Sequence, residues 1–258
     1  MSTIPSALRH EHPILIPSKG RPDARLPRLL DECELSYALV VEPQDEAAYR
    51  QVLPSARYIV LPENDRGLSY ARQQVLTLAR DARLSHFWLL DDNVRGFYRI
   101  EHGKCLPCGP EEAFGYAEWL ATNIPRAALV GLQYQQFAWN AKVAYQLNRY
   151  AYCCVLVDAE TGIDYRPEFQ FKSDVAFCLD HLTNGWRTVL VNKFAMNKPV
   201  MGANSHGGQS EGYKLHRDEE AARLLCKTFP RYATIIQKTA RIDARVNWGA
   251  FSPKSRKR

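Results

Sequence analysis

The chain has 258 residues, of which 46% are hydrophobic, 11% aromatic and 24% charged. This composition excludes disordered, collagen-like and disulfide-stapled classes, and the longest apolar run, residues 150–157, is too short to cross a membrane. The formal net charge of +6 is uneven, because residues 227–258 carry nine basic side chains and one acidic one, which leaves −2 on residues 1–226.

The first half of the chain alternates short apolar segments with helical patterns. We predict strands at residues 13–16, 36–43, 56–64 and 86–93. We predict helices between them at residues 26–34, 45–53 and 68–83. This alternation is typical of an α/β fold in which helices cover a parallel sheet. Polar residues follow the strands, at the end of the sheet where such folds bind ligands.

The second half is less regular. Helices are predicted at residues 111–122, 175–184 and 216–227, and strands at residues 126–134, 151–158 and 187–191. The stretch before residue 111 is predicted to be a loop. It contains Cys105 and Cys108, and a single CxxC pair without a clear second pair favours free thiols over a zinc site. The glycine-rich residues 202–213 are predicted to form a mobile loop.

The strongest local signal is Asp91-Asp92-Asn93, directly after the fourth strand. Two carboxylates and an amide supply oxygen ligands of the kind that Mg²⁺ or Mn²⁺ takes, with phosphate completing the set. The alternative is a turn at the end of the strand, in which an Asp caps the next helix.

Two other polar segments follow predicted strands. Residues 16–22 supply the cations Lys19 and Arg21 but lack the spacing of a P-loop. Residues 64–72 place a glycine at a helix start and Arg72 one turn in, an arrangement that suits an anion. Strand ends that converge at one edge of the sheet predict a nucleotide pocket.

The order IPSKGRP, a second strand ending in Glu42, ENDRGLSYAR and FWLLDDN resembles a GT-A-fold glycosyltransferase. Within that fold, residues 12–210 resemble the phage glycosyltransferases associated with TET/JBP dioxygenases. The resemblance implies a GT-A-like, Rossmann-type, mostly parallel sheet flanked by helices in residues 12–215, followed by a basic C-terminal segment, residues 216–258. It also implies transfer of a hexose from a nucleotide sugar, such as UDP-glucose, to 5-hydroxymethylcytosine in double-stranded DNA.

The resemblance carries site residues with it. It implies nucleotide-sugar contacts at Pro17, Ser18, Lys19, Arg21, Glu42, Asp65, Arg66, Arg72, Asp91 and Asp92. It implies a divalent metal ion, Mn²⁺ or Mg²⁺, at Asp92, Asn93 and His206. The sequence departs from the family pattern at Asn93, where many relatives carry a second acid, and a neutral ligand binds a metal ion less tightly.

Asp174 is the candidate catalytic residue. The segment from Phe171 to Phe177 is similar to the family's acidic element, whose Asp deprotonates the acceptor hydroxyl, although Ser173 replaces the usual Glu. A general base needs only one carboxylate within reach of the proton. The alternative is an acid that merely stabilises the N-terminus of a helix.

The basic C-terminal segment favours a polyanionic partner. The candidate DNA-binding residues are Lys238, Arg241, Arg245, Lys254, Arg256, Lys257 and Arg258. The alternative is a solvated, solubilising tail.

Three other functions stay open: a GT-A enzyme that acts on glycan or protein, a nucleotidyltransferase, and a non-catalytic DNA-binding module. The N-terminus lacks the features of a signal peptide, and seven scattered cysteines suit reduced thiols. We therefore expect a cytoplasmic protein, in the host cytoplasm if a phage encodes it, without a membrane partner.

Overall fold

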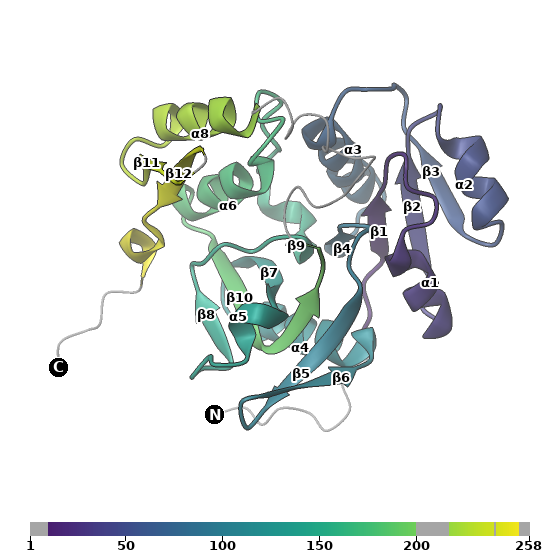
Figure 1. Cartoon of the computed structure of the whole chain (residues 1–258), viewed down its shortest axis with the longest axis horizontal. Coiled ribbons are helices and arrows are strands. Elements are labelled where there is room, and N and C mark those ends of the chain that lie inside the picture. Colours follow the sequence, from purple (N-terminus) through teal and green to yellow (C-terminus); the bar gives the residue numbers. More distant parts are fainter. Residues whose placement is uncertain (1–9, 200–216, 240, 253–258) are drawn as a thin grey trace.

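The computed structural model describes residues 10–199, 217–239 and 241–252. In these residues the chain forms a ten-stranded sheet and a separate hairpin (Figure 1). The sheet consists of β1 (Ile14–Pro17), β2 (Tyr37–Val41), β3 (Arg57–Val60), β4 (His86–Leu90), β5 (Gly96–Glu101), β6 (Lys104–Cys108), β7 (Ala127–Tyr134), β8 (Tyr145–Leu147), β9 (Cys154–Asp158) and β10 (Arg187–Asn197). Its order is β3-β2-β1-β4-β9-β7-β10-β5-β6, and β8 also pairs with β10. The hairpin consists of β11 (Ala233–Gln237) and β12 (Ile242–Val246).

The sheet is mixed and mostly parallel. Strands β1 to β4 run in one direction, with Ile14 paired to Tyr37 on one side and to Trp88 on the other. Strand β9 runs in the opposite direction between β4 and β7, and β5 and β8 run against β10. The carboxyl ends of the first four strands therefore meet at one edge. This arrangement confirms the predicted α/β fold with a mostly parallel sheet flanked by helices.

Helices cover both faces of the sheet. They are α1 (Arg25–Glu32), α2 (Glu46–Val52), α3 (Leu68–Asp81), α4 (Pro110–Asn123), α5 (Gln135–Ala138), α6 (Ser173–Thr183) and α8 (Arg217–Thr228). Ile14 and Ile16 pack with buried residues of α1, α2 and α4, whereas Leu15 packs with those of α3 and α6. Successive side chains of a strand point to opposite faces, so a strand that is apolar throughout needs cover on both sides. No described helix has the length and apolar character needed to cross a bilayer.

Two predictions for the second half were wrong. Residues 96–108, predicted to contain only a loop, form the antiparallel strands β5 and β6, and the strand predicted at residues 187–191 continues to Asn197. The turn between β5 and β6 has positive φ at His102 and Gly103, as in a tight two-residue hairpin turn. An edge hairpin is partly solvated and tolerates Pro, so it needs no continuous apolar pattern. The charged side chains and Pro107 therefore gave no strand signal in the sequence.

The C-terminal segment folds against α6. Leu225 and Phe229, in and after α8, share an apolar cluster with Leu179 of α6. Lys172, directly before α6, forms an ion pair of 2.5 Å with Asp243 of β12. The basic segment therefore has secondary structure of its own up to residue 251. The predicted domain boundary after residue 215 lies outside the described residues and stays a prediction.

The packing of α8 on α6 predicts a loss of stability in Leu225→Ala. Leu225 is 1% exposed, so we expect the free energy of unfolding to fall by about 2–4 kcal/mol. In the control variant Ile235→Ala, the side chain removed from β11 is 44% exposed, and the loss should be about 1 kcal/mol or less. Chemical denaturation measures both. Equal losses would contradict the docking of the C-terminal segment.

Candidate functional site

Side chains from the ends of three strands meet around Lys19. Lys19 follows β1, Glu42 follows β2, and Asp65 lies after β3. Lys19 Nζ lies 2.8 Å from Glu42 Oε2 and 2.5 Å from Asp65 Oδ1. Burial acts to lower the pKa of Lys19, but the two carboxylates outweigh it and the pKa is raised. The structure thus brings these three predicted nucleotide-sugar residues together at the edge of the sheet.

Asp92 is buried beneath the loop that follows β1. Its Oδ1 lies 2.8 Å from Arg21 Nη2, and its Oδ2 accepts a hydrogen bond from the Ser18 hydroxyl. Tyr49 OH lies 2.6 Å from Ser18 Oγ and accepts the backbone N–H of Arg21 at 3.0 Å. Burial raises the pKa of Asp92 to about 6, against the opposing effects of Arg21 and Ser18. Asp92 therefore holds the loop after Pro17 from beneath.

Asp91 is held between two cations. Its Oδ2 lies 2.7 Å from Lys198 Nζ and its Oδ1 3.3 Å from Arg72 Nη2. Burial acts to raise the pKa of Asp91, but Lys198 and Arg72 outweigh it and lower that pKa well below its usual range. In return, Asp91 raises the pKa of Lys198, and Asp174 together with Asp91 raises the pKa of Arg72, in both cases against the effect of burial. This network joins the end of β4 to α3 and to the end of β10.

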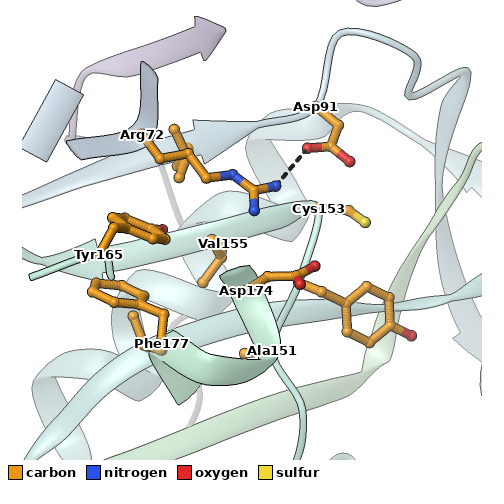
Figure 2. Close-up of a pocket in the computed structure, with 11 residues that line it drawn as sticks. Arg72, Asp91, Ala151, Cys153, Val155, Tyr165, Asp174 and Phe177 are labelled. Atoms are coloured by element: carbon orange, nitrogen blue, oxygen red, sulfur yellow. Dashed lines mark hydrogen bonds and ion pairs between the residues drawn. The ribbon is translucent and has the colours of Figure 1, made fainter. Parts of the chain in front are cut away.

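Asp91, Arg72 and Asp174 line one cleft, together with Cys153 (Figure 2). Its empty space is about 310 Å³, part of which is open to solvent. Apolar side chains form the rest of its wall, including Val155, Tyr165 and Phe177. The cleft places two carboxylates from distant parts of the sequence around one guanidinium group.

Asp174 lies in the first turn of α6, where a tyrosine holds it. Tyr150 OH donates a hydrogen bond to Asp174 Oδ2 at 2.5 Å. This contact and burial raise the pKa of Tyr150 well above its ordinary value, so the phenol stays protonated and serves as a donor. Arg72 Nη1 donates to Ser173 Oγ at 3.0 Å. Ser173 thus fixes the guanidinium group that faces Asp91.

Helix α3 is anchored so that Arg72 reaches this cleft. Gly67 precedes the helix with φ of +84°, and a Cβ there would lie 1.9 Å from Gln170 Oε1, so only glycine fits. The Ser69 hydroxyl donates to the backbone carbonyl of Phe169, in the segment before α6. Both contacts tie the start of α3 to the segment that leads to Asp174.

Arg66 does not join the other predicted site residues. Its guanidinium pairs with the exposed Glu63 at 2.6 Å and lies over the ring of Tyr70. The sequence signal for Arg66 was its place beside Gly67. A position near a helix start, however, leaves the direction of a long side chain undetermined.

The described donors do not form a site for a divalent cation. Asn93 Oδ1 is buried and accepts no hydrogen bond from a described residue, which suits a ligand atom. The two adjacent carboxylates, however, are already neutralised, Asp92 by Arg21 and Asp91 by Lys198 and Arg72. No group of three or more His, Cys, Asp or Glu in residues 10–199, 217–239 and 241–252 is arranged to hold a metal ion. The third predicted ligand, His206, lies outside those ranges, so the predicted set stays untested.

The basic hairpin is partly neutralised by its own acids. Lys238 pairs with Asp243 at 2.5 Å, and Arg241 pairs with Asp218 at 2.9 Å. Arg245 on β12 is exposed. The other candidate DNA-binding residues lie outside the described part of the chain: Lys254, Arg256, Lys257 and Arg258.

Three site residues were not predicted individually. Tyr150 lies in an aromatic-rich stretch, residues 133–152, but the sequence does not distinguish a site residue from core there. Trp248, after β12, stacks on Tyr150 with ring centroids 5.9 Å apart, and this contact joins the C-terminal segment to the residue that holds Asp174. Lys198 belongs to no motif and follows a strand whose full length was not predicted.

The chain matches a known protein family and is similar to solved structures at low sequence identity. Residues 12–208 match the family model described as TET-Associated Glycosyltransferase. A197 from STIV is a similar solved structure, with 14% identity over 74% of this chain and 86% of that chain and a TM-score of 0.44. Another is 4-diphosphocytidyl-2C-methyl-D-erythritol synthase from Anaerococcus prevotii DSM 20548, with 10% identity over 74% of this chain and 93% of that chain and a TM-score of 0.39. No curated protein sequence matches the chain.

The burial of Asp92 predicts a large effect on stability for Asp92→Asn. The amide of Asn can accept only one of the two hydrogen bonds that Arg21 and Ser18 donate to Asp92 and turns its own donor group toward the other, so we expect the free energy of unfolding to fall by about 3 kcal/mol. In the control, Glu63→Gln removes one partner of an ion pair in which both side chains are more than half exposed, and the loss should be about 0–1 kcal/mol. Urea denaturation compares the two. A loss in Asp92→Asn no larger than the control's would show that this carboxylate does not support the loop.

Proposed function

The chain belongs to the TET-associated glycosyltransferase family, and on that premise we propose that it transfers a hexose from a nucleotide sugar to the hydroxyl of 5-hydroxymethylcytosine in DNA. The observation that carries the proposal is the shared cleft of Asp91, Arg72 and Asp174. A donor site at the edge of the sheet and a carboxylate across the cleft are the two parts that such a transfer needs.

The nucleotide sugar would lie along the ends of β1 to β4. In this arrangement the loop held by Asp92 and the network of Lys19, Glu42 and Asp65 would bind the nucleoside. The cation–carboxylate network around Asp91 would lie at the diphosphate and the sugar. The described edge of the sheet therefore offers separate polar groups for each part of the donor.

Asp174 would act as the general base. As the acceptor hydroxyl attacks the anomeric carbon, its proton passes to Asp174 Oδ2 or Oδ1, a new C–O bond forms, and the bond from the anomeric carbon to the diphosphate oxygen breaks. The nucleoside diphosphate leaves with the electron pair of that bond. Tyr150 would orient the carboxylate through the hydrogen bond to Oδ2, and the apolar wall of the cleft would limit competition from water.

The acceptor would reach Asp174 from the side of the C-terminal segment. The contact of Trp248 with Tyr150 and the ion pair of Lys172 with Asp243 place the hairpin β11–β12 beside the start of α6. The target base would leave the stack to enter the cleft, because enzymes cannot reach such atoms inside a duplex.

Activity is tested by incubating the chain with hydroxymethylated DNA and UDP-glucose, or another common nucleotide sugar, and digesting the DNA to nucleosides. We expect a glycosylated nucleoside and release of a nucleoside diphosphate. Release of pyrophosphate from a nucleoside triphosphate would instead support a nucleotidyltransferase. Absence of a glycosylated nucleoside with every donor would reject the proposal.

Within that assay, Asp174→Asn should lower the rate of transfer by at least about 100-fold, because the amide cannot accept the proton. Nucleotide binding should change little. The matched control is Asp164→Asn, whose carboxylate is exposed and pairs with Arg80, and it should keep the rate of the unaltered chain. Full activity of Asp174→Asn would exclude it as the base.

The DNA surface is tested by charge neutralisation, since deleting the segment would also remove the core that it shares with α6. Arg245→Gln should weaken binding to hydroxymethylated DNA and reduce the slope of log K against log salt by about one, the share of one phosphate contact. Arg50→Gln, on α2, is the control with the same change in charge. Equal slopes in both variants would place the DNA elsewhere.

A further inference from the structure

Lys198 is a largely buried cation that contacts two residues of the cleft wall, Asp91 and Cys153, and no sequence motif identified it. It directly follows β10, and its side chain is 11% exposed. Its Nζ lies 2.7 Å from Asp91 Oδ2 and 2.9 Å from Cys153 Sγ. A buried ammonium group is costly unless it is paired, so its place beside Asp91 is a specific arrangement and not a solvated surface charge.

The ammonium group has capacity to bind a further acceptor. A lysine ammonium carries three N–H donors, and among the described residues Asp91 and Cys153 are the hydrogen-bond acceptors in contact with it. Within residues 10–199, 217–239 and 241–252, these two acceptors leave one of its three donors for another oxygen. Cys153 is a poor anion here, since burial raises the pKa of its thiol to about 12.

Arg72 supplies a second cation on the other oxygen of the same carboxylate. Its side chain is 6% exposed, and its contacts with Asp91 and Ser173 hold the guanidinium in the wall of the cleft. Two fixed cations therefore flank Asp91, which the resemblance implies is a contact of the nucleotide sugar.

We propose that Lys198 and Arg72 provide the positive charge that stabilises the diphosphate leaving group, so that transfer proceeds without a divalent cation. The proposal rests on the proposed function. As the bond from the anomeric carbon to the diphosphate oxygen breaks, that oxygen gains negative charge. Donors already fixed at this point stabilise the charge without reorganisation, and lysine and arginine are the common binders of phosphate oxygens.

Electrostatics oppose a divalent cation at the same carboxylates. A metal ion bound to Asp91 would lie within a few ångströms of the Lys198 ammonium, and like charges at that separation repel strongly in a partly buried site. Metal binding would also require the buried carboxylate of Asp92 to lose its ion pair with Arg21. The ion pairs that the chain makes by itself thus occupy the oxygen atoms that a metal ion would need.

The test measures binding and transfer in EDTA. We expect UDP, or whichever common nucleoside diphosphate binds best, to bind in EDTA as it does with Mn²⁺, and sugar transfer to hydroxymethylated DNA to persist in EDTA. Lys198→Met should weaken binding of the nucleoside diphosphate by about tenfold or more, as expected for a hydrogen bond to a charged group. It should leave binding of the corresponding nucleoside unchanged, because the nucleoside lacks the phosphates.

Lys193→Met is the matched control. Lys193 lies on the same strand, over the ring of Tyr116, and its loss should change neither binding nor transfer. Lys198→Arg keeps the charge and should retain part of the affinity, and thermal melting checks that each variant is folded. The EDTA measurement on the unaltered chain needs no variant and decides the question even if Lys198→Met fails to fold.

Each outcome separates this proposal from the proposed function. Transfer that stops in EDTA and returns with Mn²⁺ overturns the role of the two cations but supports glycosyl transfer. Unchanged affinity of folded Lys198→Met for the nucleoside diphosphate also overturns it while transfer stands. Failure of every nucleoside diphosphate to bind, together with absence of transfer, overturns the proposed function itself.

Discussion

The ion pairs on Asp91 hold the site together. One carboxylate contacts Arg72 from α3 and Lys198 from the end of β10, and its own backbone N–H donates to the carbonyl of Cys153, directly before β9. Three segments that are distant in sequence are therefore fixed relative to the end of β4. Each charge in this partly buried network needs its partner, because an unpaired charge in the same place would be far more costly than the pair.

A second ion pair, between Asp92 and Arg21, fixes the loop after β1 on the donor side of the site. Asp92 binds Ser18 and Arg21 and leaves the loop after β1 in one position, from which Lys19 reaches Glu42 and Asp65. The two adjacent carboxylates thus have different partners, because the chain turns directly after Asp91. One supports a loop from beneath, and the other faces the cleft. The two aspartates of the Asp-Asp pattern therefore lie in two different environments.

The described part of the C-terminal segment packs against the rest of the fold. Trp248 stacks on Tyr150, which holds Asp174, and Asp243 pairs with Lys172 directly before α6. A displacement of the hairpin would therefore change the environment of Asp174 through these two contacts. Two of the basic residues that suggested a DNA surface, Lys238 and Arg241, are paired within this unit to Asp243 and Asp218, whereas Arg245 is exposed.

The sequence by itself determined the α/β class, the first four strands with the helices between them, and the family to which the chain belongs. Period-two and helical patterns and turn residues are local signals that do not depend on distant segments. It did not determine β5 and β6, where an exposed edge hairpin carries charges, or the full length of β10. Only the folded chain shows that Asp91 and not Asp92 faces the cleft, that Arg66 lies outside it, and that Lys198 and Tyr150 contact residues that line it. Trp248 in turn stacks on Tyr150. The physical reason is that ion pairs and ring contacts form between side chains that only the closed sheet brings within a few ångströms of each other.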